Sequence, residues 1–171
     1  TWNSADQKSP TNVEKFRLAA VDQSGRQVVR YVPGIGTDPG VFDKYLGGAF
    51  GFGLSARLLE AYKYVTDNYV DGDRIFLLGF SRGAYAARSL TNFISKVGIL
   101  MADHLDKVEQ VYQLYEENGD GPTSPFAQYF QRLTGQPPLL IGDDKNALLV
   151  HFLGVWDTVG ALGIPLSGLR L

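Results

Sequence analysis

Cysteine is absent from this sequence of 171 residues. Its absence excludes disulfide bonds, thiolate catalysis and metal sites that use cysteine ligands. It also leaves the redox compartment undetermined, because no pair of residues would form a disulfide under oxidising conditions. Histidine is scarce, with His104 and His151 alone, and no cluster of metal ligands is visible in the sequence. We therefore expect neither a metal nor another cofactor.

A strong charge of one sign and long apolar runs are lacking as well. The formal net charge is −2, so no broad basic field exists to hold nucleic acid or an anionic membrane. The apolar runs at residues 75–78 and 147–150 have the length of strands and are far shorter than a membrane span. No signal peptide is visible, but the sequence begins with Thr1 rather than methionine. We expect a trimmed, processed or partial protein, and its localisation stays open.

The residues that are present suit one domain that spans residues 1–171, since 44% of them are hydrophobic. Apolar periodicity, capping residues and glycines predict alternating helices and strands. The expected helices cover residues 11–20, 54–69, 82–97, 105–115 and 126–133, and the expected strands cover residues 27–32, 74–79 and 147–156. Helices of this length serve as crossovers between parallel strands, so the fold class is α/β, with a mostly parallel sheet flanked by helices.

Three of these elements have features that can be checked in detail. Thr11 and Glu14 fit a capping box at the start of the first helix. The strand at residues 74–79 is continuously apolar, which is typical of a strand buried on both faces of a parallel sheet. The helix that follows it is expected to turn a set of apolar residues inward: Tyr85, Ala86, Leu90, Phe93, Ile94 and Val97.

The sequence Gly79-Phe80-Ser81-Arg82-Gly83 has the pattern G-x-S-x-G between a predicted strand and a predicted helix. This context is that of a nucleophile elbow, the sharp turn that lifts a catalytic serine above the sheet in α/β-hydrolases. Side chains two residues before and after the serine would clash in so tight a turn, which predicts glycine at both positions. The alternative is that Ser81 merely caps the helix. We favour the elbow because of the strand and helix around it.

A serine hydrolase also needs two amide donors for the oxyanion. One is the backbone N–H of Arg82, and we expect the other from Gly34 or Ile35 in the glycine-rich loop at residues 33–37. That loop could equally be a plain tight turn. Gly34 and Gly36 also resemble the start of a dinucleotide-binding turn, which would indicate an oxidoreductase, but Pro39 stands where the third glycine belongs.

The remaining members of a triad follow the serine in the order acid, then histidine. Asp157 directly follows the last predicted strand, and the carboxyl ends of parallel strands share one edge, so we expect it beside Ser81. Its alternative role is to cap a turn. His151 lies early in that strand and is expected in the core or an interface, while His104 precedes Asp157. The histidine is therefore expected outside this chain.

At these residues the sequence resembles the DUF2235 family of α/β-hydrolases, which includes the Tle1-type phospholipase effectors of bacterial type VI secretion. The matching stretches are Thr1-Trp2-Asn3, residues 31–37, residues 79–84 and residues 152–160. The resemblance implies a serine hydrolase that cleaves acyl esters, with Ser81 as the nucleophile and Asp157 as the triad acid. It also implies that the family's first strand would precede Thr1 and that its histidine would follow Leu171, so the domain would be truncated at both ends.

The expected function is hydrolysis of acyl esters of lipids or small molecules, without nucleic acid and with transient membrane contact in the full-length protein. Phe50, Phe52, Phe80 and Leu54 could line an acyl pocket near Ser81, although we favour an ordinary core role for them. The rival hypotheses are a hydrolase-like binding domain without activity and a dinucleotide-dependent oxidoreductase. Labelling of Ser81 by a fluorophosphonate would separate the hydrolase from both rivals.

Overall fold

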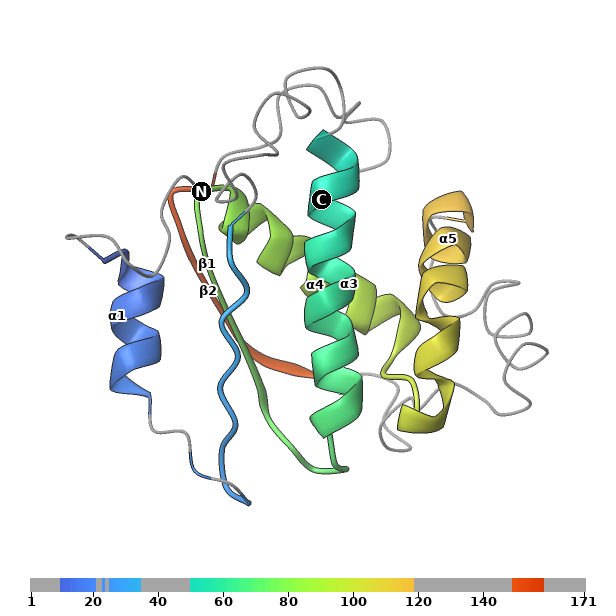
Figure 1. The fold of residues 1–171 in the computed structure, drawn as a ribbon, viewed down its shortest axis with the longest axis horizontal. Helices are drawn as coiled ribbons and strands as arrows, with labels where there is room; N and C mark the ends of the chain where they lie inside the picture. The colour runs from blue at the N-terminus through green and yellow to red at the C-terminus, as the bar shows by residue number, and fades with distance from the viewer. Residues whose placement is uncertain (1–9, 21–22, 24, 35–49, 119–148, 159–171) are drawn as a thin grey trace.

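The computed structural model describes residues 10–20, 23, 25–34, 50–118 and 149–158. Two strands, β1 (Ile75–Phe80) and β2 (Val150–Trp156), pair in parallel. The helical elements are α1 (Asn12–Ala19), α3 (Phe50–Asn68), α4 (Arg82–Val97), the 3-10 helix η1 (Ala102–Lys107) and α5 (Val108–Asn118). Figure 1 shows α1 on one side of the strand pair and α3, α4 and α5 on the other. The predicted α/β class with parallel strands flanked by helices is confirmed for this part of the chain.

The register of the strand pair places the ends of both strands together. Phe80, the last residue of β1, is paired with Trp156, the last residue of β2. β1 lies one residue further along the chain than predicted, and β2 begins at Val150, because Leu149 forms a bend. The predicted helix at residues 126–133 lies outside the described residues, so it stays a prediction.

The predicted strand at residues 27–32 is wrong. Gln27 forms an isolated antiparallel bridge with Gln23, around a turn at Gly25, and residues 28–34 continue without strand assignment. Figure 1 shows this segment with an extended course. Its composition correctly indicates extended backbone, but a strand also requires a hydrogen-bonded neighbour. Among the described residues none pairs with it in a ladder.

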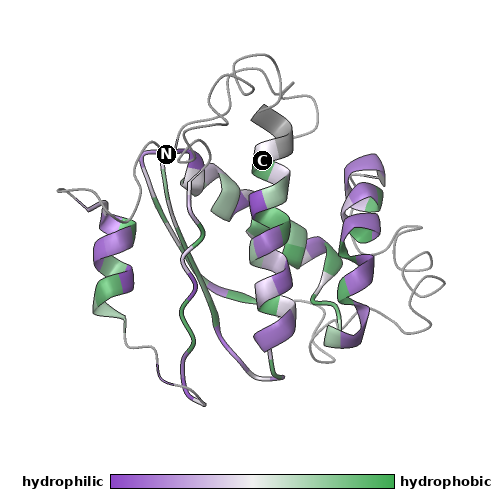
Figure 2. Cartoon of the chain, viewed as in Figure 1, coloured by the Kyte–Doolittle hydropathy of each residue, from purple (hydrophilic) through white to green (hydrophobic). Residues whose placement is uncertain are grey.

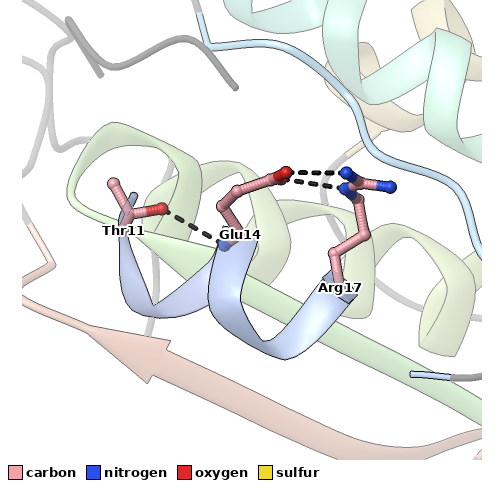
Figure 3. Close-up of polar contacts among 3 residues, drawn as sticks. All are labelled: Thr11, Glu14 and Arg17. Atoms are coloured by element: carbon pink, nitrogen blue, oxygen red, sulfur yellow. Dashed lines mark hydrogen bonds and ion pairs between the residues drawn. The ribbon is translucent and has the colours of Figure 1, made fainter. Parts of the chain in front are cut away.

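Helix α1 begins as its sequence predicts, but only half of the capping box forms (Figure 3). The N–H of Glu14 donates to Oγ1 of Thr11 at 3.3 Å, which satisfies one amide of the first turn. The carboxylate of Glu14 instead accepts two hydrogen bonds from Arg17, from Nε at 2.9 Å and from Nη2 at 2.7 Å. These bonds lower the pKa of Glu14, whose side chain is buried.

The core lies where α4 meets the sheet, α3 and α5. Helix α4 contacts both strands and both of these helices. Its buried residues are Ala84, Ala87, Leu90, Phe93, Ile94 and Val97. Tyr85 and Ala86 were also predicted to face inward, but they are half-buried. They lie beside the packed face of the helix and not at its centre. Figure 2 shows hydrophilic and hydrophobic residues alternating along α3, α4 and α5, as expected for helices that each pack one face.

Strand β1 is not buried on both of its faces, contrary to the prediction. Phe76 is 53% exposed and its paired residue Phe152 is 47% exposed, with their ring centroids 6.1 Å apart. His151 is also exposed and lies against Phe76, at 5.3 Å between ring centroids. His151 is therefore not a core residue, and its predicted alternative place in an interface stays a prediction. Helix α4 covers one face of the strand pair. The other face is exposed at Phe76 and Phe152, near the amino-terminal ends of the two strands.

Candidate functional site

The turn between β1 and α4 is sharp, and Ser81 within it has an unusual backbone conformation. Ser81 has φ 56° and ψ −120°, a backbone conformation that residues with a side chain rarely adopt. A β-carbon added at Gly79 would overlap the carbonyl oxygen of Gly83 and lie 2.6 Å from Cα of Ala84. Because these are backbone atoms, they could not move aside without displacing the helix. Gly79 is thus required for α4 to begin so close to the strand.

Gly83 does not share this requirement, contrary to the expectation for both flanking positions. Among the described residues, a β-carbon added there would meet no atom within 4 Å outside the local helix backbone. Gly83 is the second residue of α4, where its carbonyl oxygen faces Gly79 while its own Cβ position faces open space. Of the two glycines, Gly79 at the strand is therefore the one at which a side chain would clash.

Ser81 begins the helix through its backbone and not through its hydroxyl. The amides of Ala84 and Tyr85 donate to the Ser81 carbonyl oxygen at 3.0 and 3.3 Å. The Ser81 side chain makes no capping hydrogen bond. The alternative that Ser81 caps α4 with its side chain is therefore wrong for this structure.

Asp157 lies next to this turn, at the same edge of the sheet. The Ser81 N–H donates to the Trp156 carbonyl oxygen at 2.8 Å, which joins the end of β1 to the end of β2. Ser81 and Asp157 each stand one residue beyond the paired Phe80 and Trp156, on strands that are about 4.8 Å apart. No pattern in the sequence indicates the bond between the Ser81 amide and Trp156.

The backbone of Asp157 is strained like that of Ser81. Its φ is 47°, and among the described residues these two are the non-glycine residues with positive φ. Such conformations cost about 1–3 kcal/mol each and cluster at functional sites. The carboxylate of Asp157 is exposed and forms no hydrogen bond with another described residue, so nothing in this part of the chain supports its alternative role as a turn cap.

The predicted oxyanion donors are described only in part. Arg82 is the first residue of α4, where the backbone amides and the helix dipole favour an anion. Partial burial lowers the pKa of its guanidinium, which nevertheless stays charged. Gly34 is half-buried at the end of the extended segment, whereas Ile35 lies outside the described residues. The second donor therefore stays a prediction.

Neither histidine of the chain lies at this edge. His104 lies in η1, which follows the far end of α4, and a helix of 16 residues is about 24 Å long. His151 is the second residue of β2, six residues before Asp157, which corresponds to about 20 Å of strand. The two strained residues are thus brought together without either histidine of the chain.

The predicted acyl-pocket residues are described only in part. Leu54 is buried at 7% exposure and Phe80 is half-buried, while the side chains of Phe50 and Phe52 lie outside the described part. Within the described ranges no group of three or more acidic, histidine or cysteine residues could hold a metal ion. The helices described are also too short or too polar to cross a membrane.

Comparison with known proteins identifies the family of the chain. The family described as the type VI secretion system phospholipase effector Tle1-like catalytic domain matches residues 1–170. Uncharacterized protein YEL023C of Saccharomyces cerevisiae is 30% identical in an alignment of length 168, and the match covers 90% of this chain. The match covers 24% of that protein, so the chain spans about a quarter of the length of this curated relative. No solved structure matches the chain.

Proposed function

This chain belongs to the Tle1-like family of phospholipase effector catalytic domains of the type VI secretion system, and from this membership we propose that it is a serine hydrolase of acyl esters. Family membership implies the α/β-hydrolase fold and a lipid substrate. The observation on which the proposal mainly depends is the pair of strained residues, Ser81 and Asp157, at the joined ends of two parallel strands.

In the proposed mechanism the Ser81 hydroxyl attacks the carbonyl carbon of the ester and transfers its proton to a histidine. The backbone amides of Arg82 and of the loop at Gly34 and Ile35 stabilise the oxyanion. The histidine then protonates the departing alcohol, and water attacks the acyl-serine to release the acid and restore Ser81. Asp157 orients the histidine, which a part of the protein outside residues 1–171 would supply, because His104 and His151 lie at the other ends of their elements.

The proposed substrate is a phospholipid or another lipid ester. The ester must leave the bilayer far enough to reach Ser81, so we propose transient contact between the full-length protein and a membrane surface. The net charge of −2 provides no electrostatic attraction to anionic lipids over the whole chain. Membrane contact would therefore depend on parts of the protein beyond this chain or on apolar side chains near the site.

Labelling with a fluorophosphonate tests the nucleophile directly. We expect the full-length protein to be labelled at one residue, identified as Ser81 by peptide mass spectrometry, and the Ser81→Ala variant to stay unlabelled. The chain of residues 1–171 alone should react far more slowly, because no base activates its serine. No labelling of the full-length protein would contradict the proposed hydrolase.

A second candidate is a hydrolase-like binding domain without activity. It is favoured by one observation, that both histidines of the chain lie away from the turn at Ser81. This candidate predicts lipid binding by the full-length protein without hydrolysis, and binding unchanged in the Ser81→Ala variant. A sedimentation assay with phosphatidylethanolamine and phosphatidylglycerol vesicles, combined with measurement of released fatty acid, separates the two candidates.

A further inference from the structure

The face of the strand pair that points away from α4 carries a cluster of aromatic side chains. Phe76 is 53% exposed and its paired residue Phe152 is 47% exposed, and the centroids of their rings are 6.1 Å apart. The exposed ring of His151 lies beside Phe76 as well, at 5.3 Å between centroids. On the opposite face Ile75 and Val150 pack into the core. The strand pair therefore has one packed face and one face with three neighbouring rings at the surface.

A shift in the strand register brings two of these rings to the same face. Ile75 is paired with Val150. The next pair is Phe76 with Phe152, so His151 is an extra residue in β2, as in a β-bulge. In a regular strand successive side chains point to opposite faces. The extra residue interrupts this alternation, which lets both His151 and Phe152 lie beside Phe76.

Gly154 extends this surface toward the middle of the strands. A β-carbon added at Gly154 would lie 2.8 Å from Cε1 of Phe152 and 3.4 Å from Cδ2 of its paired residue Leu78. The ring of Phe152 therefore lies across the backbone of Gly154 and close to Leu78, which is half-buried. Together with Phe76, these side chains form a continuous apolar surface.

Helix α1 lies on this side of the strand pair and contacts β1, but it is too short to cover the whole face (Figure 1). A helix of eight residues is about 12 Å long, whereas the six residues of β1 extend over about 20 Å. Parallel sheets occur with both faces covered, normally by helices. The exposed rings therefore indicate that a further element packs on this face in the full-length protein.

We infer that an amphipathic helix from a part of the protein outside residues 1–171 packs on this aromatic face, which consists of Phe76, Leu78, His151 and Phe152. The chain spans about a quarter of the length of its curated relative, so a protein of that length has ample sequence to supply the helix. Apolar residues spaced three and four apart in that helix would contact the rings. This interface does not depend on the proposed hydrolase function, since Phe76 lies five residues before Ser81, about 16 Å along the strand.

A second copy of the chain fits this face less well than a helix of the same polypeptide. The two half-exposed phenylalanine side chains offer roughly 200 Å² of surface, since an aromatic side chain buries about 150–250 Å² when it is fully covered. A stable dimer buries about 800 Å² on each partner. A helix of the same polypeptide does not lose the freedom that two separate molecules lose on association, so a smaller apolar surface can hold it.

Photo-crosslinking of the full-length protein tests this inference. The photoreactive residue p-benzoylphenylalanine is placed at position 76 in one protein and at position 152 in another. Val70 is the matched control position, because it is an apolar residue with 67% exposure between α3 and β1. We expect positions 76 and 152 to form a crosslink within one polypeptide to a peptide outside residues 1–171, and position 70 to form none with that peptide. The same crosslink should form when Ser81→Ala is also present, so failure of the hydrolase proposal would leave this interface standing.

Three crosslinking results would overturn the inference: a crosslink between two copies, crosslinks confined to residues 1–171, or no crosslink from either position. Thermal unfolding of the full-length protein provides a second measurement. Phe76→Asp should lower Tm by several degrees, because the packed helix would bury the new charge. Val70→Asp should change Tm by no more than about one degree, as expected for an exposed position. Equal shifts in the two variants would show that the aromatic face stays exposed in the full-length protein.

Discussion

At the scale of single residues, the strained backbone of Ser81 links the sequence motif to chemistry. A serine at φ 56° and ψ −120° is held there by the hydrogen bond from its amide to Trp156 and by the close start of α4. Conformations of this kind are maintained only where the surrounding structure determines them. The result is a serine at the N-terminus of a helix, whose side chain makes no capping bond, with Asp157 one residue beyond the paired end of the neighbouring strand.

Replacing Ser81 by glycine should make this strain visible. Glycine adopts positive φ without a steric penalty, so Ser81→Gly should raise the free energy of unfolding by about 1 kcal/mol relative to Ser81→Ala, in which the strain stays. Both variants lose the hydroxyl and should lose fluorophosphonate labelling in the full-length protein. Urea unfolding of the two variants measures the difference. Equal stabilities would show that the turn is not strained in solution.

The two glycines of the motif should respond differently to alanine. At Gly79 the added methyl group overlaps backbone atoms of α4, so Gly79→Ala should destabilise the fold by roughly 2–4 kcal/mol and abolish labelling of Ser81. At Gly83 the added group meets open space in a helix, where alanine is preferred over glycine by about 1 kcal/mol. Gly83→Ala should therefore unfold at the same or a higher temperature. Thermal unfolding followed by circular dichroism compares the two, and equal losses would contradict the difference between the two sides of the turn.

At the scale of elements, α3 and α4 are joined by one buried hydroxyl. Tyr62 of α3 is fully buried, donates to the Gly98 carbonyl oxygen at 2.9 Å and accepts from the Leu100 amide at 3.1 Å. Burial raises the pKa of Tyr62, so the phenol stays neutral at ordinary pH. Its ring also packs on Phe93 of α4, with the centroids 4.7 Å apart. This contact fixes the chain where α4 ends, at φ 78° of Gly98.

Removing the Tyr62 hydroxyl should lower the free energy of unfolding more than removing a partly buried hydroxyl. Tyr62→Phe leaves a carbonyl and an amide without their partner in the core, which we expect to lower the free energy of unfolding by about 1–3 kcal/mol. Tyr112→Phe is the matched control, because the Tyr112 hydroxyl has its Ser55 partner 3.2 Å away at a partly buried position. Chemical denaturation of both variants gives the comparison. A larger loss for Tyr112→Phe would contradict the role assigned to Tyr62.

Helix α1 should loosen at acid pH. The hydrogen bonds from Arg17 lower the pKa of Glu14 in the folded state, so the stabilising contribution is present above the unfolded pKa of about 4.3 and is lost as the pH falls through the lower folded value. Glu14→Gln should therefore be less stable than the unaltered chain at pH 7, and the difference should shrink below pH ~4. Thermal unfolding across this pH range measures it. A difference that does not depend on pH would assign the effect to packing instead of charge.

Elements whose boundaries are marked by local sequence signals could be predicted. Strand pairing and exposure could not, because they depend on residues that are distant in the sequence. Thr11, Gly79 and Gly98 mark their turns and caps through their own chemistry, so the predicted boundaries of α1, β1 and α4 are nearly correct. The segment at residues 28–34 has the composition of a strand, but no residue in the described part of the chain pairs with it in a ladder. The exposure of Phe76 likewise depends on what covers the sheet, which no local pattern encodes.

At the scale of the whole molecule, Ser81 and Asp157 lie at one edge of the strand pair, and both histidines of the chain lie elsewhere. The adjacency of Ser81 and Asp157 follows from the sequence through the rule that parallel strands end together, and the register of β1 and β2 agrees with it. The histidine could not be derived, because both histidines of the chain lie at the wrong ends of their elements. Since the chain spans about a quarter of its curated relative, we expect another part of the protein to supply it.

If another part of the protein supplies the histidine, the side chains that the full-length enzyme needs from this chain can be predicted. Hydrolysis should survive His104→Ala and His151→Ala with kcat within about twofold of the unaltered protein, as expected for residues that do not touch the reacting groups. Asp157→Asn should lower kcat by roughly 10³–10⁴ while the fold is kept, because asparagine tolerates positive φ but leaves the histidine without its orienting charge. The measurement is kcat for a p-nitrophenyl ester, with thermal unfolding as the check on folding. Loss of activity in His104→Ala would mean that η1 reaches Ser81 in the active enzyme, and the base would then belong to this chain after all.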